Sequence, residues 1–325
     1  QMCIRDRVVG AWQEDSNQTA ITNGATASSN NSNTNSGAAY VYTRSGGVWS
    51  QEAYLKASNN DPVDLFGISV AVSGDNIVVG AYREDSNQTT VTNGSSASAD
   101  NSLDFSGAAY VFKRTAGAWA QEAYLKAPNG DSMDEFGGSV DIDGDTIVVG
   151  ASAESSNQAS ITNGASASSN NSNGASGAVY VFRKVSGSWA QEAYLKASNS
   201  DAGDFFGSSV RISGHKIVVG ALEEASTQTS ITNGSSASSN NSSAHTGAAY
   251  VFSRTGSSWE QQAYIKASNA AESEYFANSV AISSDSVIVG AYWESGNQNT
   301  ITNSSSISAS KESGKTYGAA YVFTY

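Results

Sequence analysis

The chain is poor in the residues that build covalent cross-links and metal centres. It contains one Cys and two His among 325 residues, which excludes an intrachain disulfide framework, a cysteine zinc site and a His-rich metal site. Basic residues are also scarce, with 17 Lys and Arg against 30 Asp and Glu and a net charge of −13. This balance argues against a nucleic-acid binder, because such proteins need basic surface to displace counterions from phosphates.

Proline, long apolar runs and helical periodicity are missing as well. Only 2 Pro stand against 31 Gly, so Gly, Asn, Asp and Ser must make the turns. No apolar run approaches the roughly 18–20 residues that cross a bilayer, and we expect no membrane insertion in this segment. No stretch keeps a 3.6-residue period, so helices should be nearly absent. The aromatic share of 10% is nevertheless too high for a disordered chain.

What the chain does contain is a repeat with a period of 70 residues. The segment Ile-Val-Val-Gly-Ala starts at Ile77, Ile147 and Ile217, and close variants of it start at Val8 and Val287. The blocks Gly-Ala-Ala-Tyr-Val and Gln-Glu-Ala-Tyr-Leu-Lys-Ala recur with nearly the same spacing. A fixed period of this kind indicates a repeat architecture in which each copy is one supersecondary unit.

Each period is predicted to hold four short β-strands, which in one copy cover 69–73, 76–82, 107–113 and 119–126. Short turns join the first strand to the second and the third to the fourth, as in antiparallel hairpins. Four such strands per repeat predict one blade of a β-propeller. A β-solenoid is the alternative, but its repeats are shorter, typically about 20–30 residues. The predicted fold class is therefore all-β, a propeller of about 4.5–5 blades.

Residues 1–7 match no part of the repeat, and we interpret them as a foreign head on a single propeller of residues 8–325. A divergent natural terminus is the alternative interpretation. The second and third strands occur five times but the first and fourth only four times. The segment is therefore predicted to be a fragment of a larger ring, with closure as five blades as the alternative.

The Phe-Gly-x-Ser-Val block at 66–70, followed by Ile-Val-Val-Gly-Ala and Gly-Ala-Ala-Tyr-Val-Phe, resembles the FG-GAP repeats of integrin-α-type β-propellers. It looks closest to bacterial FG-GAP repeat proteins of surface and secreted type. The resemblance implies an extracellular or cell-surface location, with the signal peptide outside this segment. Integrin-type repeats carry a calcium loop between the first two strands, but here the turn is only 73–75. Because this turn is too short for a six- or seven-oxygen cage, we expect no required cofactor.

In a propeller, the long loops between the second and third strands emerge on the same face as the acidic segments that precede each Phe-Gly. Together they hold 20 of the 30 acids, so we predict a polar, acidic loop face. The candidate ligand-contacting residues in the long loops are Glu14, Asp15, Glu84, Asp85, Glu154, Glu223, Glu224 and Glu294.

The acidic segments repeat an Asn-x-Asp-x-x-Asp motif. Its carboxylates are Asp61, Asp64, Asp131, Asp134, Asp201 and Asp204. One interpretation is that these side chains cap their own backbone turns. The other is a divalent-cation site, with Ca²⁺ as the candidate ion, because hard cations prefer carboxylate oxygens.

The long loops keep their register despite a low-complexity composition. An apolar residue followed by Asn-Gly recurs in them, as at Ile21 and 23–24, and predicts a small hairpin with a type I′ turn. Polar loops on a rigid scaffold suit the binding of a protein or a glycan. Recent duplication is the alternative explanation for their similarity.

The leading functional hypothesis is a non-enzymatic extracellular binding or adhesion module with a protein or glycan ligand at the loop face. A structural spacer or surface-array repeat is the first alternative. A fragment of a propeller enzyme acting on glycans is the second. Near-identical blades argue against the enzyme, because catalysis requires unlike residues that converge at one place.

Overall fold

The computed structural model describes residues 6–298, 300–303, 311 and 315–324, and all regular structure within them is β. Residues 1–5 of the predicted head lie outside the described part, whereas 6 and 7 already belong to the first strand. In the described part of the chain, no helix offers an apolar span that could cross a membrane.

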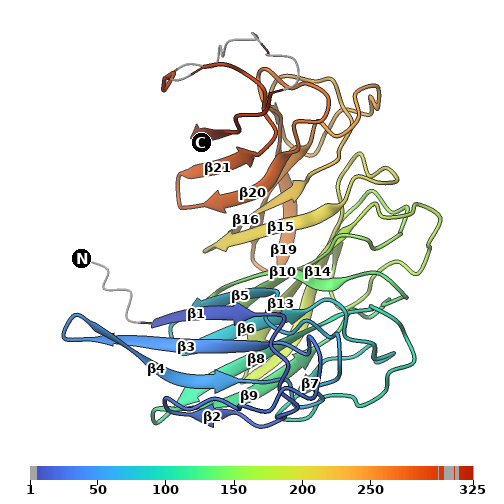
Figure 1. Cartoon of the computed structure of the whole chain (residues 1–325). Helices are drawn as coiled ribbons and strands as arrows, with labels where there is room; N and C mark the ends of the chain where they lie inside the picture. The colour runs from blue at the N-terminus through green and yellow to red at the C-terminus, as the bar shows by residue number, and fades with distance from the viewer. Residues whose placement is uncertain (1–5, 299, 304–310, 312–314, 325) are drawn as a thin grey trace.

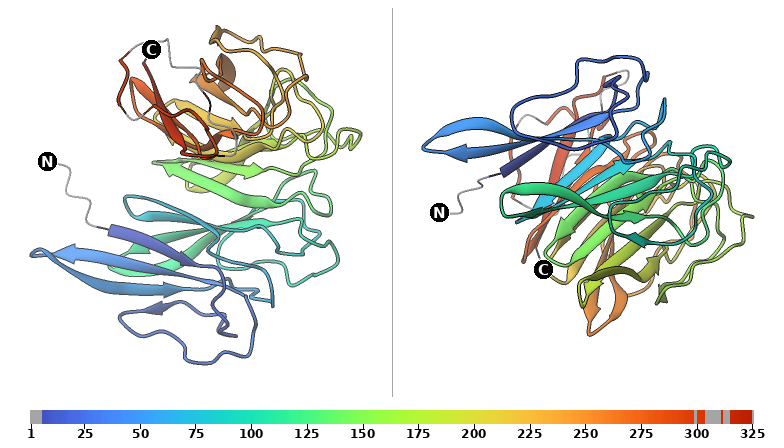
Figure 2. Two further views of the ribbon diagram at one scale, coloured as in Figure 1. Left: turned by 45° about the horizontal axis from the view of Figure 1, so that its top comes forward. Right: turned by 90° about the horizontal axis from the view of Figure 1, so that it is seen from below.

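Five antiparallel sheets follow one another in an arc along the chain (Figures 1 and 2). The first sheet contains β1 (Asp6–Ala11), β2 (Thr22–Asn23), β3 (Ala38–Ser45) and β4 (Val48–Leu55). The second contains β5 (Ser69–Ser73), β6 (Asn76–Ala81), β7 (Thr92–Asn93), β8 (Ala108–Thr115) and β9 (Ala118–Leu125). The third contains β10 (Phe136–Asp143), β11 (Thr146–Ala151), β12 (Thr162–Asn163), β13 (Ala178–Val185) and β14 (Ser188–Leu195).

The fourth sheet contains β15 (Phe206–Ser213), β16 (Lys216–Ala221), β17 (Thr232–Asn233), β18 (Ala248–Thr255) and β19 (Ser258–Ile265). The fifth contains β20 (Phe276–Ile282), β21 (Ser286–Ala291) and β22 (Ala319–Thr324). The long loops of the second, third and fourth sheets lie on one side of the arc, on the right in Figure 1, and the β3–β4 turn lies on the other. This arrangement confirms the predicted four-stranded repeat and the propeller architecture.

The predicted free hairpin in the long loop is wrong. In the second sheet, Thr92 and Asn93 form β7, which pairs with Tyr124 and Ala123 of β9. The sheet order is therefore β5-β6-β8-β9-β7, with the loop strand on the outer edge. The physical reason is that an outer strand leaves unpaired backbone groups, and the long loop is well placed to cover some of them.

Neighbouring sheets approach closely at their glycines. A Cβ at Gly80 of β6 would clash with the carbonyl oxygen of Gly137 in β10, so only glycine fits this close approach. Beside it, the Ser69 hydroxyl donates to the same Gly137 oxygen at 2.7 Å. The Phe-Gly and Val-Gly-Ala blocks thus recur because they form the contact between successive blades.

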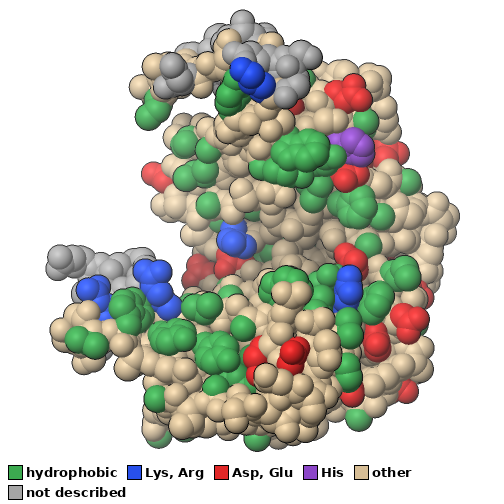
Figure 3. All heavy atoms as spheres, in the orientation of Figure 1, with side chains coloured by type: hydrophobic (Ala, Val, Ile, Leu, Met, Phe, Trp, Pro, Cys, Tyr) green, Lys and Arg blue, Asp and Glu red, His purple; other side chains and the backbone are tan. Residues whose placement is uncertain are grey.

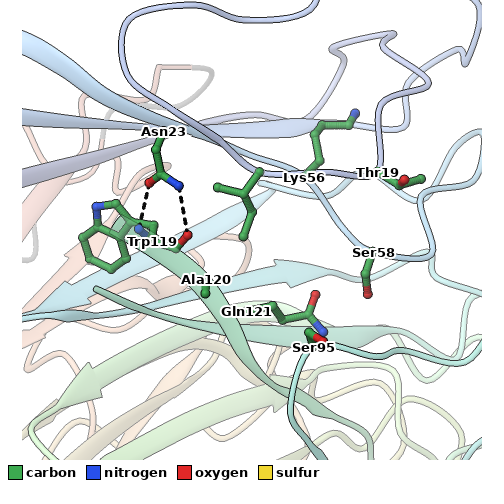
Figure 4. Close-up of a pocket in the computed structure, with 9 residues that line it drawn as sticks. Thr19, Asn23, Lys56, Ser58, Ser95, Trp119, Ala120 and Gln121 are labelled. Carbon is green, nitrogen blue, oxygen red and sulfur yellow. Dashed lines mark hydrogen bonds between the residues drawn. The ribbon is translucent and has the colours of Figure 1, made fainter. Parts of the chain in front are cut away.

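An asparagine of each of the first three long loops joins its blade to the next one. Asn23 Oδ1 accepts from the Trp119 amide at 2.7 Å, and Asn23 Nδ2 donates to the Trp119 carbonyl at 3.3 Å (Figure 4). The side-chain amide therefore pairs with β9 as a neighbouring strand would. The same two bonds join Asn93 to Trp189 and Asn163 to Trp259. A cavity of about 260 Å³ lies beside the first pair, lined by Ile21 and Trp119 among others.

Candidate functional site: the loop face

A glutamate of the long loop is buried inside each blade rather than displayed on the loop face. Glu84 is 1% exposed, and its carboxylate accepts from Lys126 Nζ at 2.9 Å, from the Tyr124 hydroxyl at 2.7 Å and from Asn59 Nδ2 at 2.9 Å. Lys126 also donates to the Ser106 hydroxyl at 2.8 Å. Burial lowers the pKa of Lys126, and the Glu84 carboxylate opposes that change. The ion pair is compensated, as a buried charge must be.

The same buried pair recurs along the chain. Its other members are Glu14 with Lys56, Glu154 with Lys196, and Glu224 with Lys266. In the fifth sheet, Glu294 pairs instead with Lys311 of its own long loop, whose side chain is 24% exposed. The prediction that Glu84, Glu154, Glu224 and Glu294 contact a ligand at the surface is therefore wrong, because all four are at most 4% exposed. Glu14, whose side chain is 14% exposed, is likewise committed to Lys56. These glutamates hold the blade together.

In each acidic segment, the second carboxylate of the motif accepts a hydrogen bond from the backbone of the same segment. Asp134 is buried, and its Oδ2 accepts from the Asp131 amide at 2.9 Å. Asp64 and Asp204 make the equivalent bond to the amides of Asp61 and Asp201 at 3.0 Å. The geometry corresponds to the capping interpretation rather than to a cation cage. Among the described residues, no three acidic or His side chains converge in a way that could hold a metal ion.

Burial shapes the electrostatics of these carboxyls. It raises the pKa of Asp134 and of Asp204 to about 7, and that of Asp64 to about 8, although a backbone hydrogen bond opposes the change in each case. The first carboxylates of the motif are partly exposed; Asp131 and Asp201 accept from loop asparagines.

The loop face is consequently less acidic than the sequence count predicts. Of the 20 acids assigned to it, 19 lie among the described residues, and eight of these are buried. They are Asp64, Glu84, Asp134, Glu154, Asp204, Glu224, Glu274 and Glu294.

Two further predicted ligand residues, Asp15 and Asp85, hold the loop backbone in place. Asp15 Oδ1 accepts from the Asn35 amide at 2.7 Å, and Asp85 Oδ1 accepts from the Phe105 amide at 2.6 Å. Burial raises the pKa of Asp85, against the effect of its backbone bond. Asp15 and Asp85 thus accept from the backbone amides of Asn35 and Phe105, two residues with an unusual backbone conformation.

That conformation is left-handed and recurs in pairs. Phe105 has φ 54° and Glu135 has φ 60°, and the Glu135 amide donates to the Phe105 carbonyl at 3.1 Å. The corresponding pairs, all with positive φ and the same bond, are Asn35 with Leu65, Ala175 with Phe205, and His245 with Tyr275. Left-handed φ costs a residue with a Cβ about 1–2 kcal/mol, and glycine would remove that cost. The fold keeps side chains there nonetheless.

These strained positions are also places where the near-identical repeats differ. Two further sets of residues, at the first and second positions after the Gly-Ala end of β1, β6, β11, β16 and β21, also differ between repeats. We call the four sets together the variable row. Its members are Trp12, Tyr82, Ser152, Leu222 and Tyr292; Gln13, Arg83, Ala153, Glu223 and Trp293; Asn35, Phe105, Ala175 and His245; and Leu65, Glu135, Phe205 and Tyr275.

Side chains of the variable row touch one another both within a repeat and across repeats. The Arg83 guanidinium lies over the rings of Tyr82 and Phe105, at 5.3 and 5.0 Å from their centroids. Farther along the chain, His245 stacks on Tyr275, with 5.5 Å between the ring centroids. All members except Leu65 are at least partly exposed. Figure 3 shows a histidine beside a group of hydrophobic side chains on this side of the molecule.

Of the predicted ligand residues, Glu223 is the one that belongs to the variable row. The sequence analysis missed the other members, although the sequence contains a signal for them. They change from repeat to repeat, whereas the Gly-Ala that precedes the first two sets and the Phe that follows the last set are kept.

A family model for the FG-GAP repeat matches the chain at 49–112, 119–182, 189–252 and 259–307. The chain belongs to the FG-GAP repeat family. The first three matched stretches run from the last full-length strand of one sheet through the third full-length strand of the next, so each spans a blade boundary. A search among curated proteins gave no match. The family assignment agrees with the blades seen here and confirms the resemblance drawn from the Phe-Gly blocks.

Proposed function

We propose that this FG-GAP repeat protein is a non-enzymatic binding module, located outside the cell or on its surface, that contacts a protein or glycan ligand through the variable row. The family supports this proposal, because FG-GAP repeats are typically non-enzymatic and often extracellular. The proposal includes no bound cation at this face, because Asp64, Asp134 and Asp204 accept hydrogen bonds from backbone amides and the buried glutamates pair with lysines.

The observation that carries the proposal is that variation and exposure coincide in the variable row, and that two of its four sets also have a strained, left-handed backbone. Buried positions such as Glu84 and Lys126 are kept from repeat to repeat, whereas the row changes between aromatic, charged and small residues. A residue that served only the fold would be glycine where φ is positive, as Gly203 is at one such place. Strain retained at exposed, variable side chains is typical of a recognition surface.

The structural spacer is the second candidate function, and the links between blades favour it. Each Asn–Trp pair locks one blade to the next, which would suit an extended surface array. A spacer needs no recognition surface, so the two functions differ in whether the variable row matters for binding.

The proposal is tested by measuring binding of the full chain to a glycan array and to immobilised fibronectin, collagen and mucin. A row variant combines Phe105→Ala, Tyr275→Ala and Trp293→Ala. A matched control carries Val48→Ser and Val185→Ser, two exposed positions at the opposite ends of the blades. We expect a bound probe to be lost by the row variant and kept by the control. Absence of binding to every probe by the folded wild type would favour the spacer.

A further inference from the structure

The last described part of the variable row is aromatic. Tyr275 precedes β20, and Tyr292 and Trp293 follow β21. The ring centroids of Tyr275 and Trp293 are 5.3 Å apart, and those of Tyr292 and Trp293 are 5.5 Å apart. Tyr292 is 49% exposed and Trp293 is 45% exposed. We call these three side chains the aromatic platform. Large apolar groups left in water together mark a binding surface.

Two polar side chains border the aromatic platform. The His245 ring stacks on Tyr275 at an interplanar angle of 13°, and His245 Nδ1 lies 3.0 Å from Glu223 Oε2. Both polar side chains are partly exposed. The site therefore combines flat apolar rings with a carboxylate and an imidazole that can accept and donate hydrogen bonds.

In the second sheet, Tyr82 and Arg83 take the positions of Tyr292 and Trp293, and Leu65 takes that of Tyr275. There the Arg83 guanidinium covers the rings of Tyr82 and Phe105. At the aromatic platform, the position of Arg83 is taken by Trp293, so a further ring replaces the cation. The same backbone thus presents a cation over two rings in one repeat and a cluster of rings in another.

We propose that the aromatic platform binds a neutral glycan, with a pyranose ring stacked on Trp293 and Tyr292 and its hydroxyls bonded to Glu223 and His245. One face of a pyranose consists of C–H groups, which pack on an aromatic face, while hydroxyls surround its rim and need polar partners. This inference rests on the proposed function, because it names the ligand class at the same face.

The size and charge of the site favour a neutral sugar over the other ligands of a loop face. A specific protein interface buries about 800 Å² per partner, far more than three rings offer, and the neighbouring loops are rich in Ser and Asn. The net charge of −13 and the Glu223 carboxylate would repel a sulfated or otherwise anionic glycan. One or two uncharged sugar rings match both constraints.

The test uses the full chain on an array of neutral glycans (mannan, galactan, β-glucan and chitin oligosaccharides), of sulfated heparin, and of the fibronectin, collagen and mucin probes named above. The dissociation constant for the best neutral ligand is then measured for Trp293→Ala, Tyr292→Ala and Trp293→Phe. The matched control is Trp49→Ala, an exposed tryptophan in β4 near the opposite ends of the blades. Thermal melts establish that every variant folds.

We expect the two alanine variants at the aromatic platform to weaken neutral-glycan binding by about tenfold or more, as for the central residues of an interface. Trp293→Phe should retain most of the affinity, since it keeps a ring, and Trp49→Ala should leave it unchanged. Equal affinity of Trp293→Ala and the wild type would overturn the inference while leaving the proposed function intact. Binding only to heparin or only to protein probes would overturn it as well. Binding to no probe at all would remove both proposals.

Discussion

The buried Glu154–Lys196 pair allows the largest stability effect to be worked out from the structure. Lys196 is 1% exposed and donates to Glu154 Oε2 at 2.9 Å, to the Ser176 hydroxyl at 2.8 Å and to the Gly177 carbonyl at 2.6 Å. Lys196→Met keeps the length of the side chain but removes the cation and all three bonds. Glu154 would then be a buried carboxylate without its counter-charge. Breaking such a pair costs about 3–5 kcal/mol.

The measurement is the free energy of unfolding in urea, followed by tryptophan fluorescence. Lys113→Met is the matched control, because Lys113 is about half exposed and lies 3.8 Å from Glu122, so its loss should cost less than about 1 kcal/mol. The double variant Glu154→Gln/Lys196→Met removes both charges. It should be less destabilised than the sum of the two single variants. A cost for Lys196→Met no larger than that for Lys113→Met would refute the assignment of Glu154 to a buried ion pair.

Three further predictions follow from the same contacts. Asp134→Asn keeps an oxygen that accepts from the Asp131 amide but cannot ionise. Because burial raises the folded pKa of Asp134 to about 7, the wild type loses stability as the pH rises from about 4 through about 7. Calorimetry should therefore show the unfolding free energy of the variant rising relative to that of the wild type by up to about 4 kcal/mol over this range, and a difference that does not change with pH would contradict the raised pKa. Asn93→Ala removes both bonds to Trp189 and should lower the free energy of unfolding by about 1–3 kcal/mol, whereas an unchanged value would show that the link between blades is not formed. Calcium or excess EDTA should leave the melting midpoint unchanged, and a rise in calcium alone would restore the cation interpretation of the Asn-x-Asp-x-x-Asp motif.

Much of the fold could be predicted because the repeat shows each of its strands four or five times. The strand at 76–82 is predicted within one residue of β6, and the strand at 119–126 within one residue of β9. The edge strand β7 could not be predicted, since two residues, Thr92 and Asn93, show no alternation and their pairing depends on where the loop crosses the blade.

The candidate site was harder to predict, because burial depends on partners that are distant in the sequence. Glu84 is predicted from the sequence to be an exposed loop acid, because the partner that buries it, Lys126, lies 42 residues away. The sequence does not distinguish Phe105 and Tyr275 from other loop residues. Their left-handed backbone, which places them in the variable row, is visible only in the structure. What separates the two groups is repetition: the buried glutamates and lysines are constant, and the exposed row varies.

The central claim is that constant residues build the blades while the variable row binds the ligand. Measuring stability and ligand affinity together, on the same variants, tests it most directly. We predict that Lys196→Met loses stability but that its folded fraction binds as tightly as the wild type. Trp293→Ala should keep its stability and lose affinity. The claim is contradicted if Lys196→Met loses affinity at full stability, or if Trp293→Ala unfolds the chain while its folded fraction still binds.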